Sequence, residues 1–181
     1  HKPTIGHPDD FVFDVIDEVL TEGVTSRLYS TLVRDKRLAA SVLSDTNYPG
    51  VRAPNLFVIA ATPLAPHTTP EVESAIYEEL DRLKAEPIST KEFERVLNGL
   101  DADLVRSLRS NSGLASQLAF YQTVAGTWRY VLNARDRIAA VTPADVQRVA
   151  AQYLTKPNRT VGVLVKKAQD KKMAAAGEVA R

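Results

Sequence analysis

Three histidines, His1, His7 and His67, are the side chains of this chain best suited to metal binding or acid–base chemistry. A hydrolytic zinc site usually needs two histidines and a carboxylate on one helical face, as in H-E-x-x-H or its inverse, H-x-x-E-H. The sequence contains neither pattern. His7 precedes a predicted helix and His67 lies in a proline-rich loop, and neither has a second histidine at helical spacing. We therefore expect no metal site and no catalytic residue within this sequence.

Other reaction classes also lack their signatures. The chain has no cysteine, which excludes thiolate nucleophiles, thiolate metal sites and disulfides. The motifs G-x-S-x-G, G-x-x-x-x-G-K-[ST] and G-x-G-x-x-G are absent, so serine hydrolysis and nucleotide binding have no support. The net charge is +1, from 23 basic and 22 acidic residues, which argues against a nucleic-acid binder. The longest apolar run, 56–61, is too short to span a membrane.

One cluster has a pattern that could recognise a ligand. It runs from Gly23 to Tyr29 and continues through 32–39, with a basic end formed by Arg34, Lys36 and Arg37. These cations complement the dipole of a helix that ends there. Arg34 stands where the chain turns into a predicted strand, so its guanidinium could bind a carbonyl or carboxylate of an extended peptide. The alternative is that Arg34 only compensates the helix dipole or forms a salt bridge.

The elements that must position this cluster follow from apolar spacing and cap signals. Apolar residues at helical spacing, together with Thr or Ser followed by Pro or Glu at helix starts, predict helices over 12–20, 25–36, 70–83, 90–108, 114–126, 127–140 and 143–153. Segments that are β-branched or alternate in polarity predict strands over 38–46, 56–61 and 160–165. The order favours an α+β fold, an antiparallel sheet backed by several helices. We expect one domain over 1–166, followed by a basic tail, 167–181, that is frayed or forms a short helix.

The cluster and its flanks resemble a known family. The sequence G-x-x-S-R-L-Y followed by L-V-R-D-K-x-L-A is similar to the second of the paired domains of M16 zinc metallopeptidases, the pitrilysin and mitochondrial processing peptidase family. His7-Pro8-Asp9 before the first helix and the closing segments 142–154 and 160–164 also fit, so the resemblance covers 1–165. It implies one domain of the M16 (LuxS/MPP-like) fold.

The resemblance also implies a function. In the family, two such domains enclose an extended peptide; the first carries zinc on H-x-x-E-H, and the second usually lacks metal. The second domain often supplies an Arg and a Tyr that hold the substrate. Arg34 matches this Arg, and Ala40 stands where the Tyr would be, so that half of the pair cannot act. A chain without the Tyr fits the zinc-bearing polypeptide, with zinc in its N-terminal domain.

We therefore expect the C-terminal domain of an M16-like zinc endopeptidase that is inactive alone. Its partners would be the N-terminal zinc-bearing domain or subunit and a peptide, and the full protein would be a dimer. Two alternatives remain: a non-catalytic scaffold or peptide-binding subunit, and a free-standing domain that assembles only with itself. The family also has a strand before the first helix, so we expect a sheet edge left partly unpaired. Bacterial periplasm and cytoplasm are both compatible with the sequence.

Overall fold

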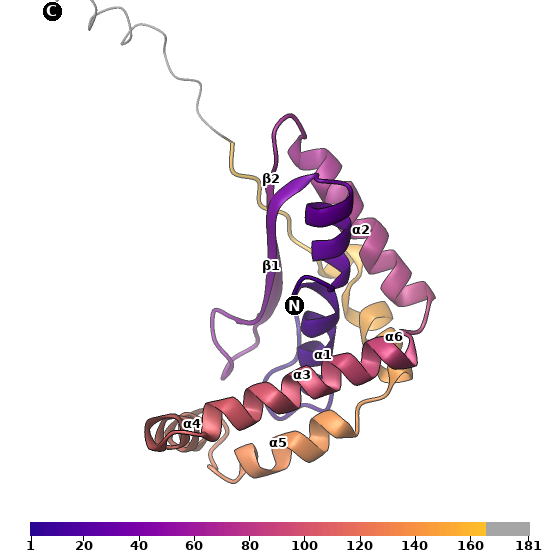
Figure 1. The fold of residues 1–181 in the computed structure, drawn as a ribbon. Coiled ribbons are helices and arrows are strands. Elements are labelled where there is room, and N and C mark those ends of the chain that lie inside the picture. The colour runs from indigo at the N-terminus through magenta and orange to yellow at the C-terminus, as the bar shows by residue number, and fades with distance from the viewer. Residues whose placement is uncertain (166–181) are drawn as a thin grey trace, which may run out of the picture.

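The computed structural model describes residues 1–165 of the chain. Its helices are α1 (Asp10–Leu20), the π-helix η1 (Tyr29–Asp35), α2 (Thr69–Ala85), α3 (Thr90–Leu108), α4 (Asn111–Val124), α5 (Tyr130–Ala139), α6 (Pro143–Tyr153) and the 3₁₀ turn η2 (Lys156–Asn158), and its strands are β1 (Ala39–Tyr48) and β2 (Leu56–Pro63). Figure 1 shows a long β-hairpin on one side of α1, with α2 on the other. This is the predicted α+β arrangement.

Helix α1 forms the centre of the core. Its apolar residues recur at helical spacing and seven are buried: Phe11, Val12, Phe13, Val15, Ile16, Val19 and Leu20. It contacts β1, α3, α5 and α6. An apolar face this wide must be covered on several sides, which explains why hairpin and helices gather around α1. The burial of such residues is the main favourable contribution to folding.

The two strands pair antiparallel, with a register that runs from Ala39 opposite Pro63 to Tyr48 opposite Leu56. The predicted hairpin is therefore confirmed. Within residues 1–165, one further bridge, between Lys2 and Asn55, lies just before β2. In residues 1–165, β2 has β1 as its only strand partner.

Helix starts follow the cap residues that the sequence contains. Thr68 and Glu71 form a capping box at α2, and Thr142 and Asp145 form one at α6. Ser110 caps α4, which therefore begins at Asn111, three residues before the predicted start. Helices α3, α4 and α5 contact one another and project together as an arm (Figure 1). No helix among the described residues is long and apolar enough to cross a membrane.

Two predicted elements differ from the structure. The helix expected over 25–36 is a π-helix over Tyr29–Asp35, with wider turns than the apolar spacing suggested. The strand expected over 160–165 is wrong, because no described strand pairs with this segment. A β-branched sequence favours an extended backbone, but a strand also needs a hydrogen-bonding edge beside it. The predicted tail, 167–181, lies outside the described residues.

Candidate functional site

The motif that begins at Gly23 builds a tight junction between α1 and η1. Gly23 has φ of +77°, a conformation that glycine adopts without strain. The hydroxyl of the buried Ser26 donates to the Gly23 carbonyl oxygen at 2.8 Å. Leu28 is fully buried. These residues therefore fix the path of the chain rather than present a ligand site.

Arg27, in the same motif, clamps the start of α3. Its Nε and Nη2 donate to Oε1 and Oε2 of Glu92, both at 2.8 Å. The side chains are mostly buried, at 14% and 21% exposure. The hydrogen bonds from Arg27 lower the pKa of Glu92 below its ordinary value. The sequence Ser89-Thr90-Lys91-Glu92 has the pattern of a capping box. Only the Ser89 half forms, and the Glu92 carboxylate binds Arg27 instead.

Arg34, the sequence-predicted substrate residue, lies on the surface at the end of η1. Its Nε and Nη2 donate to Oδ1 and Oδ2 of Asp35 at 2.7 and 3.0 Å. The two side chains are about equally exposed, at 55% and 56%. The pairing raises the pKa of Arg34 and lowers the pKa of Asp35. Ala40 is exposed on β1 and has no hydrogen-bonding side chain.

The histidines do not converge. His7 Nδ1 accepts a hydrogen bond from the Asp9 amide at 3.1 Å, at the start of α1. His67 Nδ1 lies 3.8 Å from Glu71 Oε2, before α2. Within residues 1–165, no group of three or more His, Asp or Glu side chains is placed to hold a metal ion. The described residues therefore do not fit a zinc site.

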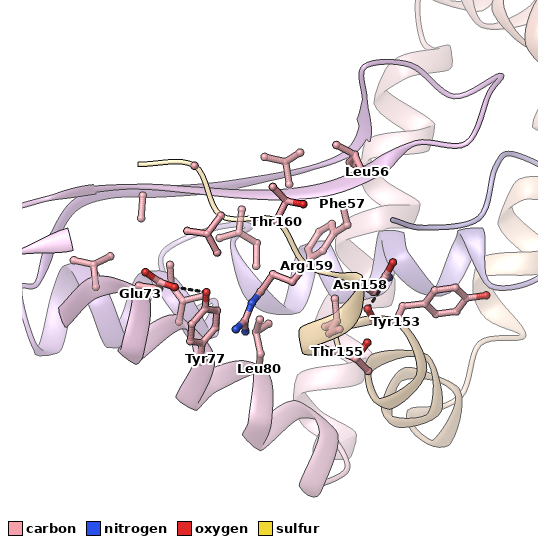
Figure 2. Close-up of a pocket in the computed structure, with 18 of the residues that line it drawn as sticks. Leu56, Phe57, Glu73, Tyr77, Leu80, Tyr153, Thr155, Asn158, Arg159 and Thr160 are labelled. Atoms are coloured by element: carbon pink, nitrogen blue, oxygen red, sulfur yellow. Dashed lines mark hydrogen bonds between the residues drawn. The ribbon is translucent and has the colours of Figure 1, made fainter. Parts of the chain in front are cut away.

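A groove of about 440 Å³ lies between β2, α2 and the segment 153–163. Its walls are mainly apolar, with Phe57, Val58 and Ile76 among them. Figure 2 shows Arg159 pointing across it toward Tyr77. The guanidinium carbon of Arg159 lies 3.7 Å from the centroid of the Tyr77 ring, and the Tyr77 hydroxyl donates to Glu73. Neither Arg34 nor Ala40 lines this groove.

The first residues of the chain lie at one end of the groove. The amide of Lys2 donates to the Asn55 carbonyl oxygen at 3.0 Å, and Asn158 Nδ2 donates to the His1 carbonyl oxygen at 2.8 Å. These contacts hold the chain between the beginning of β2 and η2. The mainly apolar lining of the groove suits an apolar ligand rather than acid–base chemistry.

Comparisons with known proteins identify the family to which this fold belongs. Residues 1–100 match the family model described as the peptidase M16 inactive domain. The zinc protease PqqE of Helicobacter pylori is 26% identical over 151 residues, and an uncharacterized zinc protease of Streptomyces coelicolor is 30% identical over 155 residues. The matches cover 83% and 84% of this chain but 33% of each relative, so the chain spans about one third of their length.

A solved structure supports the same assignment. The crystal structure of an inactive peptidase domain from Bordetella parapertussis superimposes with a TM-score of 0.79 at 27% identity. The match covers 93% of this chain and 91% of that one. The sequence-based resemblance and fold class are therefore confirmed, and the chain belongs to the peptidase M16 inactive-domain family.

Proposed function

We propose that this chain is the metal-free half of a zinc endopeptidase, in which it forms one wall of the space that encloses a peptide. The match of residues 1–100 to the M16 inactive domain carries the proposal. Two relatives are zinc proteases of which this chain spans one third. The described residues offer no cluster for a metal. The zinc and the general base would therefore come from an N-terminal domain or subunit outside this sequence.

The chain's own contribution would be to shape the wall and orient the substrate. Arg34 is exposed at the junction between η1 and β1, where its guanidinium could reach a peptide. To do so, it would exchange the carboxylate of Asp35 for a group of the peptide, which costs little because both side chains are solvated. The proposed domain covers 1–166, and the complete protein would form a dimer.

The direct test uses the longer protein, prepared with and without the segment that corresponds to this chain. Hydrolysis of an internally quenched peptide should require both parts, and Arg34→Ala should lower kcat/KM. An unchanged kcat/KM in Arg34→Ala would remove Arg34 from substrate recognition and leave the enclosing role intact. Full hydrolysis without this segment would refute the proposed function.

A second candidate is a non-catalytic scaffold or peptide-binding subunit. The observation that favours it is the absence of a hydroxyl at Ala40, which leaves the family's substrate-holding pair incomplete. The same experiment separates the two functions. A longer protein that binds the quenched peptide but never cleaves it, with zinc added, would support the scaffold.

A further inference from the structure

Three cations end the η1 turn, and two of them already have carboxylate partners. Arg34 makes two hydrogen bonds to Asp35, and Lys36 Nζ donates to Glu78 Oε2 at 3.1 Å. Arg37 differs. It is exposed, and within residues 1–165 its side chain has no hydrogen bond and no ion pair. Its guanidinium is therefore the one cation of this turn that is available to a ligand without displacing a carboxylate of the chain.

The backbone at Arg37 is unusual as well. Its φ is +50°, and among the described non-glycine residues it alone has a positive φ. The turn explains this geometry: the Lys36 amide donates to the Thr31 carbonyl oxygen at 3.0 Å and the Leu38 amide donates to the Leu32 carbonyl oxygen at 2.8 Å. Closing the wide π-turn in this way reverses the chain into β1. Glycine would adopt this φ more easily, so an arginine here costs stability without an internal contact in return.

The guanidinium of Arg37 is well suited to binding a carboxylate. A guanidinium offers five N–H donors in a planar fork that binds a carboxylate with two parallel hydrogen bonds. Arg34 already donates two hydrogen bonds to the carboxylate of Asp35. The side chain of Ala40, three residues after Arg37, has no hydrogen-bond donor. A carboxylate that approached the start of β1 would therefore meet Arg37 as its strongest available partner.

We infer that Arg37 is a specificity-determining residue that binds a carboxylate of the peptide substrate. This inference rests on the proposed function and deepens it, because it assigns a preference for peptides that carry an acidic side chain or a free C-terminal carboxylate near this wall. Arg37 would act on binding rather than on the chemical step. Its effect should therefore appear in KM, with kcat little changed.

The test uses the longer protein that contains the zinc-bearing part and this chain. The substrates are quenched peptides matched in sequence, with Glu or Gln at one position, and each with a free or an amidated C-terminus. Arg37→Gly keeps the positive φ and removes the guanidinium. It should lower the Glu-over-Gln ratio, or the free-over-amidated ratio, of kcat/KM by about tenfold, the factor expected for one charged hydrogen-bonded contact. Whichever ratio falls identifies which carboxylate is bound.

Controls separate recognition from structure. Arg109→Ala removes an exposed arginine at the end of α3 and should change neither ratio. Arg37→Gly should also raise the melting temperature, since it relieves strain, whereas a purely structural Arg37 would lose stability with it. Unchanged ratios in Arg37→Gly would overturn the inference while the proposed function stands. No hydrolysis of any of these peptides by the natural protein would overturn both.

Discussion

The ion pair between Arg27 and Glu92 offers a sharp test of how the shared motif works. The two side chains make two charge-assisted hydrogen bonds at 2.8 Å and are only 14% and 21% exposed. Arg27→Ala leaves the Glu92 carboxylate partly buried without its partner. It also removes the link between the segment after α1 and the first turn of α3. We therefore expect a large loss of stability with the fold otherwise retained.

The magnitude follows from burial. Hydrogen bonds to a charged group contribute about 1.5–3 kcal/mol, and breaking a buried ion pair costs about 3–5 kcal/mol. Because the pair is partly exposed, we expect Arg27→Ala to lower the free energy of unfolding by about 2–3 kcal/mol. For a chain of this size that corresponds to a fall in melting temperature of roughly 5–10 °C. Because the pKa of Glu92 is lowered by Arg27, this contribution is present above the ordinary pKa of Glu92 and is lost as pH falls through the folded value.

The assay is urea unfolding near pH 7 of the natural chain, Arg27→Ala, Glu92→Ala and the double variant, combined as a double-mutant cycle. The matched control is the pair Arg34–Asp35, which has the same two-bond geometry but lies in solvent. Arg34→Ala should leave the unfolding midpoint unchanged. A coupling energy near zero for Arg27 and Glu92 would refute the reasoning, because burial would then not distinguish the two pairs.

Three further predictions concern stability. Burial and the neighbouring Asp10 raise the pKa of Asp14 to about 7, so the natural chain should gain stability as pH falls from 8 toward 5. Asp14→Asn should flatten this pH dependence, measured as the midpoint of urea unfolding at each pH. The same pH dependence in both proteins would contradict the prediction. Thr142→Ala should cost about 1 kcal/mol because α6 loses its cap, measured by circular dichroism. Leu83→Ala, at a fully buried position of α2, should cost about 2–5 kcal/mol, whereas Leu132→Ala, 59% exposed, should cost far less.

Local signals made the helices and the hairpin predictable. Thr142 and Asp145 mark the start of α6 because the cap is built from neighbouring residues. The apolar spacing over 12–20 likewise identified most of the buried residues of α1, although it missed Phe11 and Phe13. Such features depend on residues within one turn, so they are visible in the sequence before any tertiary contact is known.

Features that depend on distant residues were not predictable. The segment 160–165 has the composition of a strand, but strand formation depends on a neighbouring edge. The π-turns of η1 are an exception, because the hydrogen bond from the Lys36 amide to the Thr31 carbonyl oxygen is local, and apolar spacing alone does not distinguish such turns from α-helical ones. Asp9 directly precedes α1, yet its carboxylate accepts hydrogen bonds from Arg148 and Tyr153 of α6, which are distant in the sequence.

The candidate site also combines features that the sequence predicts with features that depend on tertiary contacts. Sequence resemblance selected Arg34 from the basic end of the motif, and the structure places it in solvent, paired with Asp35. Arg27, two residues before Tyr29, is the arginine that the fold uses internally. Nothing local distinguishes the two arginines, since the difference is the position of Glu92 at the start of α3. Arg37 stood out only once its backbone conformation was known.

The central proposal is that this chain completes a zinc protease without supplying its metal. The most direct measurement titrates the chain into the separately prepared zinc-bearing part and follows hydrolysis of a quenched peptide, with zinc quantified in each component. The account predicts no stoichiometric zinc and no hydrolysis for this chain alone, and activity that rises to a plateau at a one-to-one ratio. Zinc bound one-to-one by this chain with hydrolysis on its own, or full activity of the zinc-bearing part without it, would contradict the account.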